Sequence, residues 1–224
     1  MELQSVIPWG RTLAEYQAMF LLTPEDRDKS ILGCGDGPAS FNAEWSELGG
    51  RVISVDPIYQ FDQQAIRNRI SEVYDEILSK MESDHDRYDW DDIPSVQALG
   101  ILRMKAMNRF LEDYVMGSSD GRYRMGQLPN LDFADDSFEL ALCSHYLFLY
   151  SQHVDCPTHL QSLLELARIS AEVRIYPLVT LEGTPSPYLD PVMESLISHG
   201  LKVHLKPVPY RFQKGAHNML VIER

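Results

Sequence analysis

The chain has few cysteines and no long apolar segment. Three of its 224 residues are cysteine, without paired spacing, so the sequence predicts neither a disulfide framework nor a zinc site. No apolar run approaches the ~20 residues that a membrane-spanning helix needs. The first residues, MELQSVIPWGR, lack the basic start and apolar block of a secretory signal. We therefore expect a soluble protein of the cytoplasm.

Basic residues are also scarce. Lys and Arg number 20 against 33 Asp and Glu, which gives a net charge of −13. A protein that binds nucleic acid through its phosphates needs a basic face, and no Lys/Arg cluster supplies one. The seven histidines are scattered without metal-ligand spacing. The composition favours a small molecule or a protein as partner over nucleic acid, a membrane or a metal ion.

One stretch, residues 30–56, carries the most informative pattern. It reads SILGCGDGPASFNAEWSELGGRVISVD: an apolar run, a glycine turn, a helical segment, a β-rich run at 51–55 and a terminal acid, Asp56. This order is typical of the nucleotide-binding half of a Rossmann-like sheet. Glycines adopt positive φ freely and let backbone N–H groups approach a ligand. An acid about twenty residues on is placed to accept hydrogen bonds from ribose hydroxyls.

The glycine spacing separates the ligands that such a turn can bind. Dinucleotide sites require G-x-G-x-x-G, but Pro38 stands at the third glycine position, and Gly33, Gly35 and Gly37 form G-x-G-x-G instead. This triplet, followed by Asp56, resembles motif I of class I S-adenosylmethionine (SAM) methyltransferases. We expect Pro38 in the first turn of the next helix, where its missing N–H is unpaired in any case. The alternative is an empty Rossmann turn that uses glycine for geometry only.

Helical and β-rich segments alternate along the rest of the chain. The sequence predicts helices at 12–22, 158–171 and 191–199, a helix start at 23–24, and strands at 122–125, 138–143, 173–179, 202–205 and 219–222. The last two strands are joined too closely for a parallel crossover, so they pair antiparallel. We expect an α/β fold with a doubly wound, mostly parallel sheet and a C-terminal antiparallel hairpin.

A second segment extends the resemblance. Residues 125–140, MGQLPNLDFADDSFEL, resemble the methyltransferase stretch G-D-A-x-x-L-P-F-x-D-x-S-F-D-L, which runs from the third strand into the fourth. From 30 to 224 the chain is similar to class I SAM-dependent methyltransferases. Three of its segments, CGDGPASFNAE, SVDPIYQF and CSHYLFLYS, resemble the sequences of a bacterial group of them. The resemblance implies a seven-stranded Rossmann-like sheet with SAM as cofactor. It places the cofactor beside Gly33, Cys34, Gly35, Asp36, Gly37, Asp56, Pro57, Gln127, Leu128 and Ser144.

Three departures from the family pattern bear on activity. In the family, an acid two residues before the first glycine helps to hold the SAM amino group. Ile31 stands at that position here, which leaves Asp36 as the nearest substitute. A second family acid reaches the adenine amino group; Gln127 replaces it, and its side-chain carbonyl still accepts that hydrogen bond. The L-K-P-G-G turn before the fifth strand is replaced by residues 169–172. A non-catalytic SAM- or nucleotide-binding regulatory module is therefore the alternative to an enzyme.

The sequence contains one candidate for a catalytic base. Methyl transfer is an in-line displacement that depends mainly on alignment, and only hydroxyl or amine acceptors need a base. His145, just after the strand predicted at 138–143, is that candidate; its structural alternative is hydrogen bonding within the loop.

A dehydrogenase is the rival enzyme class, since Tyr210 and Lys214 match Y-x-x-x-K. Neighbouring prolines and a glycine place this pair in a hairpin loop, whereas the motif requires a helix.

The connection between the second and third predicted strands is unusually long. The sequence predicts N-terminal helices in 1–29, a helical insertion at 62–121 with helices at 62–81 and 94–114, and a single methyltransferase-like domain over 1–224. An acidic loop at 82–92, with Tyr88 and Trp90, joins the two inserted helices. The insertion is either structural, or a cap over the crevice that selects the acceptor, or a docking face for a protein. The methyl acceptor and the oligomeric state stay open.

Overall fold

Within residues 7–224, which the computed structural model describes, the central sheet has seven strands in the order β3-β2-β1-β4-β5-β7-β6. The strands are β1 (Ser30–Cys34), β2 (Arg51–Val55), β3 (Tyr123–Arg124), β4 (Phe138–Ser144), β5 (Ser170–Tyr176), β6 (Lys202–Pro207) and β7 (Asn218–Glu223). The pairs β1–β2, β1–β4, β2–β3 and β4–β5 are parallel, while β7 lies antiparallel to β5 and β6. The expected doubly wound sheet with its C-terminal hairpin is confirmed.

The helices connect the strands in the order that the periodicity predicts. The α-helices are α1 (Leu13–Phe20), α2 (Phe41–Glu47), α3 (Gln63–Ser83), α4 (Val96–Ser119), α5 (Cys156–Ile169) and α6 (Leu189–Ser198). Short 3₁₀ helices are η2 (Pro24–Asp28), η3 (Pro57–Gln60), η4 (His85–Arg87) and η5 (Phe148–Tyr150). The start of α1 shows why the sequence folds this way locally. Thr12 and Glu15 form a capping box, in which each side chain accepts a hydrogen bond from the other's backbone N–H.

Both faces of the sheet are covered, as β4 illustrates. Leu140 and Leu142 pack into an apolar cluster with residues of α1 and α2, whereas Ala141 and Cys143 pack into a second cluster with residues of α5 and α6. Successive strand residues point to opposite faces. A strand that is buried on both sides therefore reads as a continuous apolar run, which is the pattern of residues 140–143.

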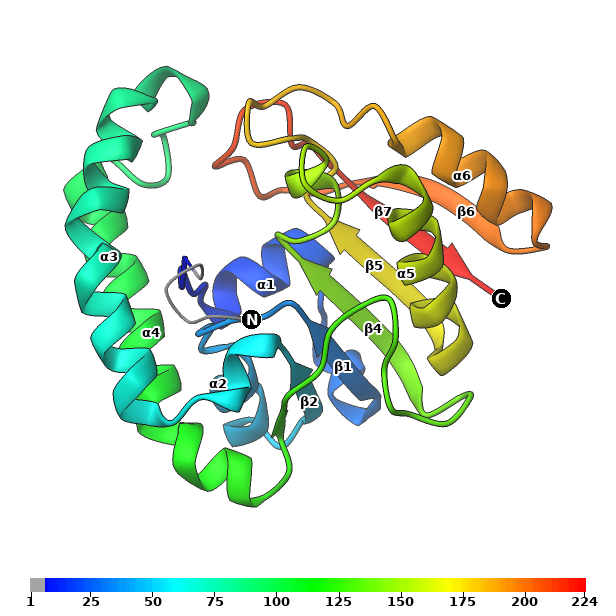
Figure 1. Ribbon diagram of the computed structural model, residues 1–224, viewed down its shortest axis with the longest axis horizontal. Coiled ribbons are helices and arrows are strands. Elements are labelled where there is room, and N and C mark those ends of the chain that lie inside the picture. The colour runs from blue at the N-terminus through cyan, green and yellow to red at the C-terminus, as the bar shows by residue number, and fades with distance from the viewer. Residues whose placement is uncertain (1–6) are drawn as a thin grey trace.

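The long insertion forms a separate layer at the β3 edge of the sheet. Helices α3 and α4 span 21 and 24 residues and lie side by side (Figure 1). Their apolar faces meet in a third cluster, which contains Ile66 and Ile70 from α3 and Phe110 and Tyr114 from α4. Tyr59 of η3 also belongs to this cluster, so the insertion packs against the segment that follows β2.

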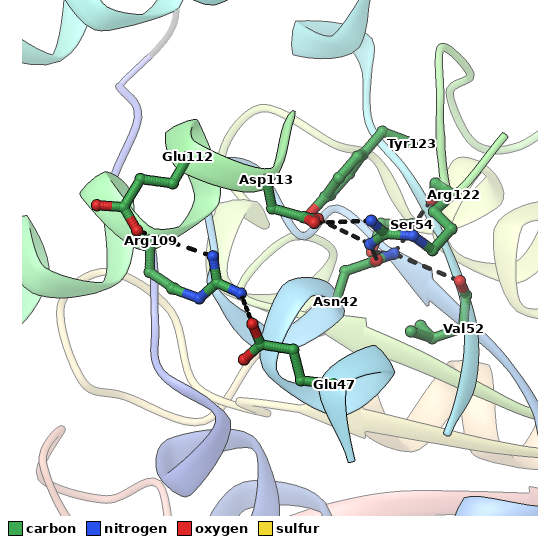
Figure 2. A network of polar contacts seen from close by, with 9 residues as sticks. All are labelled: Asn42, Glu47, Val52, Ser54, Arg109, Glu112, Asp113, Arg122 and Tyr123. Atoms are coloured by element: carbon green, nitrogen blue, oxygen red, sulfur yellow. Dashed lines mark hydrogen bonds and ion pairs between the residues drawn. The ribbon is translucent and has the colours of Figure 1, made fainter. Parts of the chain in front are cut away.

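A polar network holds α4 against α2 and the edge strands (Figure 2). Asp113 of α4 accepts two hydrogen bonds of 2.7 Å from the guanidinium of Arg122 and one of 2.9 Å from the Tyr123 hydroxyl. The Asn42 side chain of α2 donates to the carbonyl of Arg122 and to the hydroxyl of Ser54. Paired Arg–carboxylate contacts of this kind fix orientation as well as adding energy. The network therefore sets the position of β2, whose end carries Asp56.

Two local expectations are wrong. Pro38 does not begin a helix: it lies in a turn, and α2 starts three residues later at Phe41. The chain needs this turn because Ser40 bonds back to the N-terminal segment, its N–H donating to the carbonyl of Arg11 at 3.0 Å. The strand predicted at 173–179 begins earlier, at Ser170, directly after α5. Helix and strand join without an intervening turn, which explains why the glycine turn of the family is absent.

Candidate functional site

A small cavity opens at the carboxyl ends of β1 and β2. It has a volume of about 120 Å³ and is lined by Cys34, Gly35, Val55, Asp56, Pro57, Gly126, Gln127, Leu128 and Tyr146. Six of these residues are among those predicted to contact the cofactor. Ligands of doubly wound sheets bind at this edge, where the strand order reverses. The five other predicted residues, Gly33, Asp36, Gly37, Ser144 and His145, do not line this cavity.

Asp56 lies at the end of β2 and holds the glycine turn in place. One carboxylate oxygen accepts a hydrogen bond of 2.9 Å from the Gly37 N–H, and the other accepts one of 2.8 Å from the Ile58 N–H. Burial raises the pKa of this carboxyl to about 6, although both backbone donors oppose the rise. Each oxygen keeps a second lone pair. Asp56 can therefore fix the turn and still accept a bond from a ligand hydroxyl.

Asp36 points into the protein interior and does not line the cavity. Its oxygens accept hydrogen bonds from the Tyr16 hydroxyl at 2.7 Å and the Ser54 hydroxyl at 2.5 Å, and it is buried. A β-carbon added at Gly33 would stand 1.9 Å from an Asp36 oxygen. Gly33 is thus required by the inward carboxylate. Asp36 thus links the end of β1 with β2 and α1, and each of its oxygens is bonded inside the protein.

The other two glycines differ in what surrounds them. Both have positive φ, 73° at Gly35 and 52° at Gly37. An added β-carbon at Gly37 would meet no atom within 4 Å, whereas one at Gly35 would stand 3.2 Å from the β-carbon of Tyr146. The Gly37 carbonyl also accepts a hydrogen bond of 2.7 Å from the Tyr59 hydroxyl. Tyr59 therefore anchors the turn.

Three lining residues, Val55, Gly126 and Tyr146, were not among those predicted to contact the cofactor, and Tyr146 has the largest side chain of them. It is half-buried, follows the end of β4 and faces Gly35 across the cavity. Burial raises the pKa of its hydroxyl, and a contact with Gln127 opposes that rise. No local signal distinguished it from His145: both residues lie beyond the last residue of β4, Ser144, and His145 has a φ of 50°, so strand alternation does not apply to them. Of the two, the structure places Tyr146 in the lining of the cavity.

His145 lies on the other side of this edge. Its φ is 50°, its N–H donates to the carbonyl of Tyr176 at 2.8 Å, and its ring packs edge-on against the Tyr176 ring. The Ser144 hydroxyl lies 3.0 Å from the His145 Nδ1. Burial and then the charges of Arg11 and Arg103 hold the pKa of His145 well below its usual range. The imidazole is consequently neutral at pH 7, the form that accepts a proton.

A buried ion pair stands near His145. Arg103 of α4 is fully buried, and its Nη1 donates to a Glu15 oxygen at 2.7 Å. The Tyr210 hydroxyl donates to the other Glu15 oxygen at 2.8 Å. The sequence carried a signal for this cluster, because Arg103 falls on the same helix face as the apolar residues Leu99 and Ala106. A charged side chain on a buried face needs a partner.

The two residues of the dehydrogenase motif do not face each other in the structure. Tyr210 and Lys214 lie between β6 and β7, outside any helix, as predicted. The Tyr210 hydroxyl bonds to Glu15, whereas the Lys214 Nζ donates to the carbonyl of Asp86.

Across residues 7–224 no group of His, Cys, Asp and Glu side chains is arranged to hold a metal ion. None of the helices in the described part of the chain is long and apolar enough to cross a bilayer.

The tip of the insertion docks onto the β6–β7 loop. The Asp89 N–H donates to the Phe212 carbonyl at 2.8 Å. The Tyr88 ring stacks on the Phe212 ring at 5.0 Å, and the Trp90 ring meets it edge-on at 5.4 Å. A second cavity of about 240 Å³ lies below this junction. It is lined by Thr12, Ala14, Glu15, Ala18, Asp89, Asp92, Ile93, Leu102, Tyr210, Arg211 and Phe212.

Comparisons with known proteins give a distant relative and a shared fold. No protein-family model matches the chain. The archaeal protein MJ0045 of Methanocaldococcus jannaschii is 28% identical over 225 residues, which cover 100% of this chain and 99% of that protein. The solved structure of the PH0226 protein from Pyrococcus horikoshii OT3 has a TM-score of 0.51 at 11% identity, over 94% of this chain and 88% of that one. A structure of magnesium protoporphyrin IX methyltransferase from Synechocystis PCC 6803 with bound SAM gives a TM-score of 0.46 at 10% identity, over 88% and 70%. The PH0226 match shows that the two chains share the fold.

Proposed function

We propose that the protein is a SAM-dependent methyltransferase that acts on a small molecule or a protein in the cytoplasm. One observation carries the proposal: the cavity at the strand ends brings together Gly35, Asp56 and Gln127. These are the G-x-G turn, the acid after the second strand and the polar residue after the third. They occupy the positions at which the sequence pattern matches the methyltransferase family.

The hydrogen-bond acceptors of the cavity suit an adenosine group. Asp56 has lone pairs for ribose hydroxyls, and the Gln127 carbonyl can accept from an adenine amino group. The volume of about 120 Å³ is below the ~300 Å³ of a small-ligand pocket, so it holds only part of SAM. Tyr146 limits the space toward the end of β4. Binding of the whole cofactor therefore requires this half-buried side chain to move.

Chemistry in the proposed enzyme needs little from the protein beyond geometry. When bound, SAM supplies the methyl group for an in-line displacement. The chain would align the acceptor with it and exclude water. His145 is neutral and lies directly after β4, so we assign it the removal of a proton from a hydroxyl or amine acceptor.

The docked insertion suits a cap over the acceptor. Tyr88 and Trp90 hold its tip against Phe212, so opening and closing would break and remake an aromatic contact. With Trp9 and Trp45 replaced by Phe, the fluorescence of Trp90 reports on this contact. A change on addition of SAM or acceptor is the expected result. A signal that no ligand moves would make the insertion a scaffold.

Calorimetry with SAM, S-adenosylhomocysteine and NADH tests the cofactor. We expect both adenosyl ligands to bind and NADH to fail. Asp56→Ala should weaken SAM binding by about 1.5–3 kcal/mol, the usual value for a lost hydrogen bond to a charged group. Unchanged affinity in a folded variant would remove Asp56 from the proposed site.

A non-catalytic nucleotide-binding module is the second candidate. The observation that favours it is the loss of the motif I acid at Ile31 together with the inward orientation of Asp36. Among the residues that line the cavity, Asp56 is the one acid, and its two oxygens already accept hydrogen bonds from backbone N–H groups. Tight binding of S-adenosylhomocysteine with no methyl transfer to any of a broad acceptor panel would support this module.

A further inference from the structure

Two arginines near His145 have buried donors without a protein partner. Among the described residues, neither the Nε nor the Nη2 of Arg103 has a hydrogen-bond partner, although the side chain is fully buried. The buried Nε of Arg11 also lacks one, while its Nη1 donates to the Trp9 carbonyl at 3.2 Å. Buried guanidinium N–H groups are normally satisfied, because leaving one unpaired forfeits its solvation.

The charges in this region do not balance. Arg11 and Arg103 bring two positive charges, and each lowers the pKa of His145, so both lie near that ring. Glu15 is the carboxylate that pairs with Arg103, and its charge acts on Arg11 as well. The other groups packed there, His145 and Tyr210, are neutral at pH 7 because burial shifts both pKa values away from the charged form. Among these groups, positive charges exceed negative charges by one; Asp36, a further buried carboxylate, is bonded to the Tyr16 and Ser54 hydroxyls.

The position of this surplus charge is that of a ligand site. His145 follows β4 and packs on Tyr176, the last residue of β5. The Tyr176 ring lies edge-on to Tyr210 at 5.8 Å. The arginines therefore lie at the carboxyl ends of β4 and β5, next to the adenosine cavity along the same edge of the sheet. An anion that contacts both guanidinium groups would meet three donor nitrogens without a protein partner, and a surplus positive charge.

We propose that Arg11 and Arg103 form a binding site for a carboxylate or phosphate group, carried by the methyl acceptor, beside His145. The assignment to the acceptor rests on the proposed function, whereas the anion site itself does not. The same chemistry has a second source, the amino-acid carboxylate of the cofactor. The acceptor is the better assignment because Arg103 is anchored to Glu15 of α1, which also accepts from Tyr210, and neither arginine lines the adenosine cavity.

Inorganic phosphate is the probe. The full chain is titrated with phosphate against chloride at constant ionic strength, and the melting temperature is recorded. We expect a saturable rise for phosphate only. Arg11→Gln removes one free donor and the surplus charge without breaking the Glu15–Arg103 pair, and should weaken phosphate binding about tenfold or more. Glu15→Gln removes the carboxylate and should strengthen it. Arg109→Gln, a matched control on α4 whose side chain pairs with Glu47, should change nothing.

Arg11→Gln should weaken phosphate binding and Glu15→Gln should strengthen it, whereas Arg109→Gln should leave it unchanged. This pattern distinguishes a specific anion site from a general effect of charge. Equal stabilisation by phosphate and chloride, or the same phosphate affinity in Arg11→Gln as in the wild type, would overturn the proposal. Loss of folding in Glu15→Gln would leave the comparison of Arg11→Gln with Arg109→Gln to decide the question.

Competition then identifies the source of the anion. Phosphate that still binds in the presence of saturating S-adenosylhomocysteine supports the acceptor. Phosphate displaced by S-adenosylhomocysteine but not by 5′-methylthioadenosine, which lacks the amino-acid part, supports the anion site but overturns its assignment to the acceptor. Phosphate binding without any binding of either adenosyl compound would preserve the anion site and refute the proposed methyltransferase.

Discussion

Asp36 provides a sharp test of which carboxylate serves the cofactor and which serves the fold. It lies in the glycine turn, but its oxygens accept hydrogen bonds from Tyr16 and Ser54 in the interior. Burial raises its pKa from 3.8 to about 6, against the lowering effect of those two hydrogen bonds. The charge of Asp56 adds to the rise. The folded protein therefore binds a proton at Asp36 more tightly than the unfolded chain does.

The sign and size of the effect follow from this shift. The stability contributed by protonated Asp36 is fully present below the unfolded pKa of 3.8 and is lost as the pH rises through about 6. The shift corresponds to ~3 kcal/mol of unfolding free energy. Asp36→Asn removes this dependence and keeps the contacts, since an amide accepts from one hydroxyl and donates to the other. Between about pH 4 and pH 7 the wild type should lose ~2.5 kcal/mol more stability than the variant.

Urea unfolding of both proteins across this pH range measures the difference. Asp75→Asn, at an exposed position of α3, is the control and should follow the wild type. Because Asp36 does not line the cavity, Asp36→Asn should also keep its SAM affinity within about threefold of the wild type at pH 7.5. Parallel stability curves for Asp36→Asn and the wild type would refute the buried-proton argument. A large loss of SAM affinity would return Asp36 to the cofactor site.

Three further substitutions test the turn, the scaffold and the chemistry. Gly35→Val should abolish SAM binding and destabilise the protein by ~1–3 kcal/mol, since φ is 73° and the β-carbon would press on Tyr146; calorimetry and urea unfolding measure the two effects. Asp113→Ala should lower the free energy of unfolding by about 2–3 kcal/mol, because Arg122 loses both of its carboxylate bonds. An effect on unfolding below about 0.5 kcal/mol would show that the network in Figure 2 is incidental. His145→Ala should lower methyl transfer to a hydroxyl or amine acceptor by ~100-fold or more with SAM affinity retained; normal turnover would make His145 structural.

The order of elements was predictable from local pattern. The strand at 51–55 is rich in β-branched residues, the runs 140–143 of β4 and 219–222 of β7 are continuously apolar, and the apolar residues of α3 and α4 repeat at helical spacing. Element ends were less predictable, since β5 starts at Ser170 and α2 at Phe41, where neighbouring segments decide the bounds. The antiparallel end of the sheet followed from connection length alone, because a parallel crossover needs a dozen or more residues.

The candidate site was predictable only in part. Glycine turns and acids at strand ends are local signals, so sequence alone located Gly35, Asp56 and Gln127, which the structure brings together at one cavity. The orientation of a side chain is not a local property. Asp36 turns inward because Tyr16, from a helix twenty residues earlier, offers it a hydroxyl.

By itself, the sequence determined the fold class, the glycine turn and the chemical types of the residues along the strand edge. Only the tertiary structure decided that Tyr146 rather than His145 faces the cavity. It also joined Arg103 with Glu15, 88 residues apart in the chain. The physical reason is that periodicity and turn chemistry act over a few residues, whereas a buried charge is paired across the core by whichever distant segment packs against it.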